Sequence, residues 1–251
     1  MYTHSLNLIA SSVAFLFLFL LCSSMVYYYF KIPKKEHDSS LGGSFILSYQ
    51  LRQWWTWIIS PLENLFVNKQ ISPVSITSLG LLFSIAAGFL YSQGLISLAG
   101  FSLLGSAILD ILDGRVARRR HLSSQLGAFV DSVFDRIGEF FIFGGLLSYF
   151  AFLKFYFFTI LIIILGSFLT SYCKARAESL GVKCEVGILQ RPERLAILIV
   201  ISCLGPVLSY LCGFGLLFFL NITLVLFAML TSITFFQRLE HSLKLLSSSK
   251  L

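Results

Sequence analysis

Four aspartates stand close together in an apolar part of the chain. Asp110 and Asp113 are three residues apart, Asp131 and Asp135 are four apart, and all lie within 26 residues. An ionised carboxylate in apolar surroundings is costly unless it pairs with a cation or holds a metal. Clustered carboxylate oxygens suit hard divalent cations such as magnesium, manganese or calcium. The pattern therefore suggests a metal site, and leaves an ion pathway or plain ion pairing as alternatives.

The spacing of these aspartates is typical of helices. On a helix, Asp110 and Asp113 share one face, and Gly127, Asp131 and Asp135 share a face of the next helix. If the two helices are antiparallel neighbours, these faces can point at each other. We therefore predict that the four carboxylates surround one point.

Two glycines and an arginine accompany the aspartates. Gly114 and Gly127 could let a ligand approach the backbone closely, or could let two helices pack tightly. Because Gly114 follows Asp113 and Arg118 is one turn away, we favour ligand access. A metal held by carboxylates beside an arginine is suited to a phosphate or pyrophosphate group.

The composition places these residues in a membrane protein. The chain is 57% hydrophobic and 12% charged, about half the charged fraction of a soluble domain. Apolar runs near 20 residues recur along it, which indicates a polytopic α-helical membrane protein. The net charge of +7 falls in short loops, so we expect contact with anionic lipid or an anionic substrate and no nucleic acid. The five cysteines include no CxxC pair, and we expect them to be small core residues.

The predicted fold class is all-α: a helical bundle with a six-span core, one extra N-terminal span and an interfacial helix. We expect the core spans at 74–91, 95–115, 125–149, 152–173, 192–209 and 214–236. An uncleaved apolar run at 6–30 precedes them, and Trp54, Trp55 and Trp57 indicate a helix lying at the headgroup level. The predicted divisions are an anchor and linker (1–43), an interfacial segment (44–70), the membrane domain (71–240) and a cytoplasmic tail (241–251).

The basic residues predict the orientation of the bundle. If the loop 31–72 is cytoplasmic, then the loops near 116–126 and 174–194 and the tail are cytoplasmic too. Of the 19 Lys and Arg residues, only Lys154 then lies on the opposite side. Such an asymmetry orients membrane proteins. We expect an integral protein of the cell inner membrane or its equivalent, with the aspartates facing the cytoplasm.

The residues so far form a longer pattern, D-x2-D-G-x2-A-R-x8-G-x3-D-x3-D. Its eight fixed positions are Asp110, Asp113, Gly114, Ala117, Arg118, Gly127, Asp131 and Asp135. This pattern resembles the signature of the CDP-alcohol phosphotransferase (CDP-alcohol phosphatidyltransferase) family. The resemblance covers roughly residues 71–240, including six spans.

The resemblance implies an enzyme that uses a CDP-linked lipid donor and one or two Mg²⁺ or Mn²⁺ ions. It implies that Asp110, Asp113, Asp131 and Asp135 hold the metal and that Asp135 is the general base that activates an acceptor hydroxyl, with release of CMP. The implied donor-binding residues are Asp110, Asp113, Gly114, Ala117, Arg118 and Gly127, together with Pro73 and Thr77 at the start of the first core span. That span reads Pro-Val-Ser-Ile-Thr where many members have Pro-Asn-x-x-Thr.

The acceptor is suggested by residues that follow the motif. Arg136, directly after the last aspartate, and the segments 171–178 and 190–194 are similar to the phosphatidylinositol-phosphate synthase branch. The resemblance implies that the acceptor phosphate is held by Lys174, Arg194, Arg136, Arg191 and Arg238. Glu139 stands where inositol-type members often have Asp. Glycerol 3-phosphate is also a phosphate monoester, so a phosphatidylglycerophosphate synthase stays an alternative.

We therefore predict metal-dependent transfer of a phosphatidyl group from CDP-diacylglycerol, or a related CDP-alcohol, to an inositol phosphate-like acceptor. The expected partners are the lipid donor, a small phosphorylated polyol, the bilayer and a second copy in a homodimer. An ion-coupled transporter is the alternative from another class. It would require acidic or polar residues deep in several spans, and the last three spans consist mainly of Leu, Ile, Phe and Val. Ion pairing alone would join the aspartates to Arg115, Arg118 and Arg136.

Overall fold

The structure, a computed structural model, describes residues 2–31, 49–184 and 186–248, and these form helices joined by short turns. The helices are α1 (Tyr2–Lys31), α2 (Tyr49–Asn68), α3 (Pro73–Ser92), α4 (Ile96–Arg119), α5 (Gln125–Tyr149), α6 (Lys154–Ser179), α7 (Arg191–Leu211) and α8 (Phe218–Ser248). No strand occurs in these ranges, and the all-α prediction is confirmed. Most of the predicted linker before residue 44 lies outside the described residues.

The helix starts nearest the aspartates are fixed by side-chain caps. The Ser75 backbone N–H donates to the Ser72 hydroxyl at the start of α3, over 3.1 Å. The Gly127 N–H does the same with Ser124 at the start of α5, also over 3.1 Å. At α7 the carboxylate of Glu193 accepts from the Gln190 N–H at 2.9 Å. These bonds satisfy N–H groups that would otherwise have no partner in the helix.

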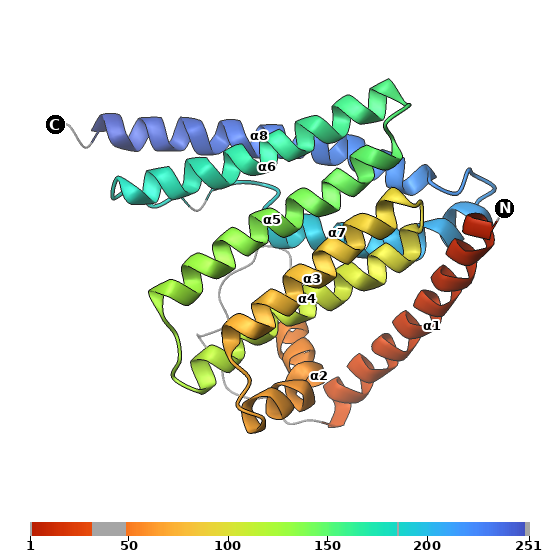
Figure 1. Cartoon of the computed structure of the whole chain (residues 1–251), viewed down its shortest axis with the longest axis horizontal. Coiled ribbons are helices and arrows are strands. Elements are labelled where there is room, and N and C mark those ends of the chain that lie inside the picture. Colours follow the sequence, from red (N-terminus) through yellow and green to blue (C-terminus); the bar gives the residue numbers. More distant parts are fainter. Residues whose placement is uncertain (1, 32–48, 185, 249–251) are drawn as a thin grey trace.

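The helices alternate in direction, so one end of the bundle collects the functional segments. α3 packs against both α4 and α5, α4 packs against α7, and α6 packs against α8. Figure 1 shows the turn between α4 and α5 at the lower left, and α1 running along the right side from the N-terminus. The end of α4 and the start of α5 are therefore neighbours, as the aspartate spacing predicts.

α3 and α5 touch backbone to backbone. A Cβ atom added to Gly145 would collide with the carbonyl oxygen of Gly88, and one added to Gly88 would collide with the carbonyl oxygen of Phe141. Close approach of this kind requires residues without side chains. The contact fixes α5, which carries two of the aspartates, against α3.

Six of the described helices are long and apolar enough to cross a membrane: α1, α3, α4, α6, α7 and α8. α5 is not among them, since it contains Asp131, Asp135, Arg136 and Glu139. Its assignment as a span stays a prediction, as does the interfacial position of α2. α8 continues to Ser248 without a break, where we expected a separate tail.

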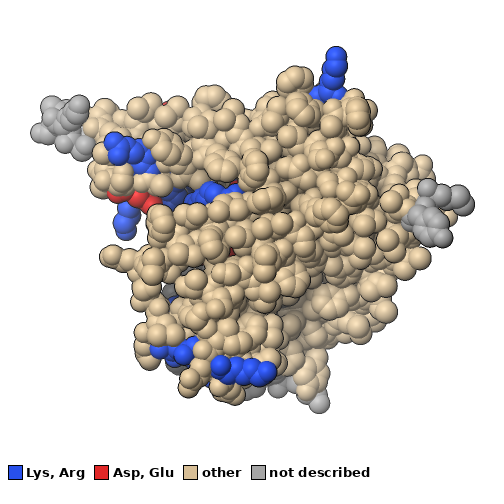
Figure 2. Space-filling view, viewed as in Figure 1, with Lys and Arg blue, Asp and Glu red and all other residues tan. Residues whose placement is uncertain are grey.

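On the face drawn in Figure 2, most exposed charged side chains lie near the edges. In Figure 2 the Lys and Arg residues gather along the left and lower edges, with one more at the upper right, and the broad middle of this face has almost none. An uncharged band between charged ends is typical of a protein that crosses a bilayer.

α1 is fastened to the core by buried polar groups. The Asn7 amide donates to the carbonyl of Gly94 at 2.7 Å, and its oxygen accepts from the backbone N–H of Ser97 at 3.1 Å. The hydroxyls of Ser11 and Ser97 lie 2.7 Å apart. α1 thereby packs on α4 and α7. At its other end, the indole N–H of Trp54, a residue 7% exposed, donates to the Ser24 hydroxyl at 3.2 Å.

Candidate active site

Three of the four motif aspartates meet at one point. Asp110 comes from the last turns of α4, and Asp131 and Asp135 come from the second and third turns of α5. One carboxylate oxygen from each lies within 4.8 Å of the others. This geometry matches a site for a hard divalent cation.

Asp113 lies one turn further along α4 and is not part of that group. It is 7% exposed, and its Oδ2 is buried without a hydrogen-bond partner among the described residues. Oδ1 of Asp131 is in the same situation. Buried polar atoms are almost always partnered in folded proteins. Unpartnered oxygens on Asp113 and on Asp131, itself a member of the converging group, fit a site whose ligand is a cation.

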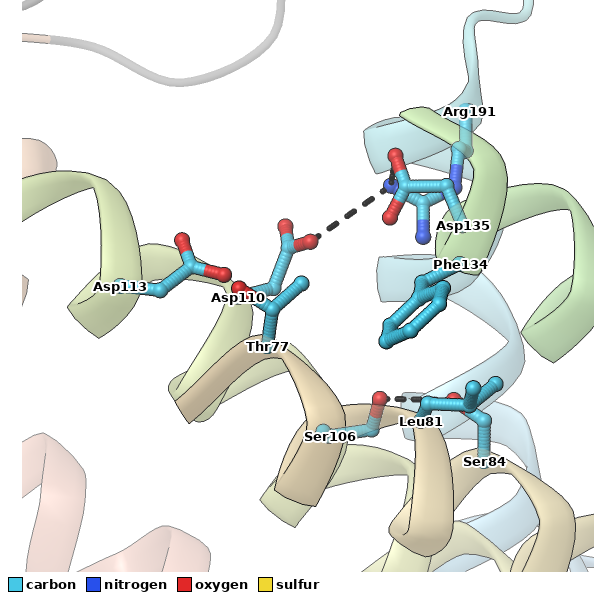
Figure 3. Close-up of a pocket in the computed structure, with 10 residues that line it drawn as sticks. Thr77, Leu81, Ser84, Ser106, Asp110, Asp113, Phe134, Asp135 and Arg191 are labelled. Atoms are coloured by element: carbon cyan, nitrogen blue, oxygen red, sulfur yellow. Dashed lines mark hydrogen bonds and ion pairs between the residues drawn. The ribbon is translucent and has the colours of Figure 1, made fainter. Parts of the chain in front are cut away.

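Arg191 reaches into the same cluster from the first turn of α7. Its Nη1 lies 2.6 Å from Oδ2 of Asp135 and 3.8 Å from Oδ1 of Asp110. Figure 3 shows the guanidinium beside Asp135, with a dashed line to Asp110; the two carboxylates come from different helices. Nη1 of Arg136 is 3.8 Å from the same Asp135 oxygen. Two of the four arginines assigned to the acceptor phosphate from sequence, Arg136 and Arg191, therefore lie beside the carboxylates.

Two pockets border the carboxylates. The larger spans about 730 Å³, counting the solvent at its open mouth, and is lined by Pro73, Val74, Thr77, Asp113, Gly114, Ala117, Arg118, Leu122, Ser123, Ser124, Gly127, Ala128 and Asp131. The smaller spans about 270 Å³ on the same basis, and its lining includes Asp110, Asp135, Arg191 and Phe134 (Figure 3). Thr77 and Asp113 line both. Seven of the eight residues predicted to bind the donor thus line the larger pocket, and Asp110 lines the adjoining one.

The two motif glycines leave space in the larger pocket. A Cβ atom on Gly114 would lie 3.3 Å from the guanidinium of Arg118, and one on Gly127 would meet only the hydroxyl of Ser124. Within the described part of the chain, a Cβ atom on either glycine would meet no backbone of another helix, in contrast to Gly88 and Gly145. This observation favours ligand access over helix packing as the reason for glycine at these positions.

Two of the other predicted acceptor residues are held by the protein itself. Arg194, 2% exposed, forms an ion pair with the buried Glu139, which also accepts from the Ser167 hydroxyl at 3.3 Å. Arg238 donates to the carbonyls of Val186 and Thr170, each at 2.9 Å.

Lys174, the remaining acceptor candidate, is nearly half exposed. Its Nζ lies 3.7 Å from Oε1 of Glu178 on the same helix.

Arg194, although it pairs with Glu139, has one N–H left for a ligand. Its Nε is buried without a partner among the described residues.

One ionic contact near the site was not anticipated. Arg115, considered from sequence as a partner of the aspartates, points to Glu63 of α2, with Nη2 2.6 Å from Oε2. The sequence carries one signal for this contact, because Glu63 is the single acidic residue of segment 44–70. Pairing the aspartates with Arg115 is therefore wrong.

The sequence is similar to one protein family and to several known proteins. The sequence profile of the family described as CDP-alcohol phosphatidyltransferase matches residues 70–236. The archaetidylinositol phosphate synthase of Methanothermobacter thermautotrophicus is 34% identical over 172 residues, 65% of this chain and 79% of that protein. The phosphatidylinositol phosphate synthase of Mycobacteroides abscessus is 30% identical over 193 residues, 75% of this chain and 85% of that protein.

Solved structures show the same similarity. The phosphatidylinositol phosphate synthase of Mycobacterium tuberculosis with CDP-DAG bound has a TM-score of 0.66 and 30% identity, covering 74% of this chain and 93% of that one. The same enzyme in complex with manganese and citrate has a TM-score of 0.66 and 29% identity, covering 73% and 88%.

Proposed function

Because the chain belongs to the CDP-alcohol phosphatidyltransferase family and is an integral membrane enzyme, we propose that it transfers a phosphatidyl group from CDP-diacylglycerol, or a related CDP-linked lipid, to a hydroxyl of an inositol phosphate-like acceptor. The observation that carries this proposal is the convergence of Asp110, Asp131 and Asp135 beside the pocket of about 730 Å³. The names of the relatives support an inositol phosphate acceptor.

The larger pocket is proposed to hold the CDP part of the donor. Gly114 and Gly127 leave room for the nucleotide to lie against the helix backbones. Arg118 presents a guanidinium, which binds phosphate oxygens through paired N–H groups. A relative with CDP-DAG bound supports this assignment.

The carboxylates are proposed to hold one or two divalent cations, either Mg²⁺ or Mn²⁺. Asp110, Asp131 and Asp135 would provide converging oxygens, and Asp113 would add its buried, unpartnered oxygen. When bound, the cation neutralises the diphosphate and improves CMP as a leaving group. The manganese complex of a relative supports a metal at such a site.

Asp135 is proposed to be the general base. Its carboxylate takes the proton of the acceptor hydroxyl as that oxygen bonds to the β-phosphorus of the donor. The bond from this phosphorus to the oxygen of CMP breaks, and CMP leaves with the bonding electrons. Asp135 suits this role because it faces both the cluster and the smaller pocket.

The acceptor phosphate is proposed to bind the basic residues Lys174, Arg194, Arg136, Arg191 and Arg238. Lys174 is nearly half exposed, and Arg194 has an unpartnered N–H. Arginine clusters bind phosphate through paired hydrogen bonds. Arg136 and Arg191 already lie at the carboxylates, so an acceptor held by them would have its hydroxyl near Asp135.

The site is proposed to face the cytoplasm in a homodimeric enzyme. All helix ends that form it lie in or beside the segments that hold nearly all Lys and Arg residues, which membrane proteins keep on the cytoplasmic side. There a soluble phosphorylated polyol could meet a donor whose acyl chains stay in the bilayer.

The deciding experiment measures CMP release by the purified protein with Mg²⁺ and CDP-diacylglycerol. Inositol 1-phosphate, myo-inositol, glycerol 3-phosphate and serine are compared as acceptors. We expect inositol 1-phosphate to give the highest rate. Release with glycerol 3-phosphate alone would overturn the inositol assignment, and no release with any acceptor would overturn CDP-diacylglycerol as the donor.

A further inference from the structure

The last turns of α4 have two opposite faces. With 3.6 residues per turn, Asp110, Asp113, Gly114 and Ala117 lie on one face, and Leu112, Arg115, Val116 and Arg119 lie on the other. The first face lines the carboxylate cluster and the two pockets. Residues that contact the second face therefore support the site from the opposite side of α4.

The second face packs on α2 through apolar side chains. Ile59 of α2 forms one buried cluster with Leu109, Leu112 and Val116 of α4 and with Ile76 of α3. Phe66 and Val67, from the end of α2, pack against the same cluster. These apolar contacts hold α2 against α4, but they do not fix how far one helix is shifted along the other, because apolar contact has no preferred direction.

Directional contacts come from one buried carboxylate. Glu63 is 5% exposed, and its Oε2 accepts from Nε of Arg115 at 2.7 Å and lies 2.6 Å from Nη2 of the same arginine. Its Oε1 lies 3.4 Å from Nη1 of Arg119, and that nitrogen also donates to Oδ1 of Asn64 at 2.5 Å. A carboxylate buried in this way is stable only while its partners stay in place. Glu63 therefore ties two successive turns of α4 to α2.

α2 is itself held on its other side. The Trp54 indole donates to Ser24 of α1, and the rings of Trp57 and Tyr28 lie 5.6 Å apart. α2 thus connects α1 to the end of α4. Both α1 and α2 precede the part of the chain that matches the family profile, which begins at residue 70.

We propose that α2 is a brace for the catalytic end of α4, and that Glu63 is a positioning residue for the metal-binding and donor-binding side chains on the opposite face. This inference rests on the proposed function of that face. Asp110 and Asp113 are like charges on neighbouring turns of a helix that ends six residues later at Arg119, and their repulsion favours fraying. Metal and substrate sites depend on positions held within about 0.5 Å. The ion pairs on the back of α4 provide that constraint.

The test compares the full-length wild type with Glu63→Gln, both reconstituted in lipid nanodiscs. Mn²⁺ binding is measured by electron paramagnetic resonance, and the KM values for donor and acceptor are measured separately. We expect Mn²⁺ binding to weaken and the donor KM to rise, each about tenfold, because a charge-assisted hydrogen-bond network is lost. The acceptor KM stays unchanged. A mere loss of folded protein would lower kcat and leave both KM values as they are.

Glu240→Gln is the matched control. Its carboxylate pairs with Lys244 on the exposed surface of α8, so the same substitution there should change neither Mn²⁺ binding nor KM. A double-mutant cycle with Arg115→Gln then tests the pair. If the two residues act through each other, the double variant loses no more Mn²⁺ affinity than either single variant.

Glu63→Gln with Mn²⁺ affinity and donor KM within twofold of the wild type would overturn the brace. If Glu63→Gln does not fold, Arg115→Lys decides, because it keeps the charge and loses the planar fork. Weaker Mn²⁺ binding by folded Arg115→Lys supports the brace, and unchanged binding overturns it. A wild type that neither binds Mn²⁺ nor releases CMP would instead contradict the proposed function.

Discussion

At Asp135 a carboxylate that contacts an arginine also borders the smaller pocket and belongs to the converging cluster. We expect Asp135→Asn to lower CMP release by about 10³-fold, because an amide cannot take the proton of the acceptor hydroxyl. The shape of the side chain is kept, so donor binding should persist. Turnover assays and binding of CDP-diacylglycerol in nanodiscs measure the two effects. A variant with wild-type turnover would show that another group is the base.

Arg191 places a positive charge where the proposed cation would bind. The guanidinium and the cation would compete for the carboxylates of Asp110 and Asp135, and their positive charges repel each other. We therefore expect the Arg191→Gln variant to bind Mn²⁺ about tenfold more tightly than the wild type. Electron paramagnetic resonance of free Mn²⁺ measures the change. Arg176→Gln, at the exposed end of α6, is the control and should leave the affinity unaltered. Weaker binding by Arg191→Gln would instead mean that the arginine supports the metal site.

The sequence predicts which residues share a face and cannot predict which cation each carboxylate meets. Helical spacing, with two adjacent antiparallel helices, predicted that all four aspartates meet; Asp110, Asp131 and Asp135 do, whereas Asp113 lies outside their group. The partners of Arg115 and Arg191 depend on how α2 and α7 pack against α4, and no local pattern records that packing. Buried pairs such as Arg194 with Glu139 are hidden for the same reason.

At the level of the elements, the contact between α3 and α5 decides how accurately the two aspartate helices meet. We expect Gly88→Ala to destabilise the protein by about 3 kcal/mol, because the added methyl group meets a backbone carbonyl that cannot rotate away. Thermal unfolding in detergent measures the loss. Gly144→Ala is a neighbouring control with open space around it among the described residues, and it should unfold at or above the wild-type temperature because alanine favours a helix more than glycine does. Equal unfolding temperatures for both variants would mean that the two helices can separate at little cost.

The helix limits were predictable where the sequence carries strong signals. The predicted span starts at 74, 125 and 192 lie within one residue of the observed starts of α3, α5 and α7 at Pro73, Gln125 and Arg191. The end of α8 was not predictable, since a polar segment after residue 236 suggested a tail. In the structure Arg238 and Ser242 are buried, and Ser242 donates to the sulfur of Cys184 at 3.7 Å. Polar residues there face a polar interior, so the helix continues.

At the level of the whole molecule, the proposed orientation places the α7–α8 turn outside the cell. Cys212 is exposed in that turn, whereas Cys184 and Cys203 are buried. We expect a membrane-impermeant maleimide to label Cys212 in intact cells. The Ser179→Cys variant, in a Cys212→Ser background, should be labelled only after the membrane is permeabilised. The reverse pattern would place the aspartates on the outer side.

The hydrogen bonds between α1 and the start of α4 join parts of the chain that are synthesised far apart. Asn7 meets its partner Ser97, 90 residues later in the chain, only after α4 has been synthesised. The contacts of α1 with α2, such as Trp54 with Ser24, join residues that are closer in the chain and can form earlier. Of the two attachments of α1, the one to α4 is therefore the later to become available.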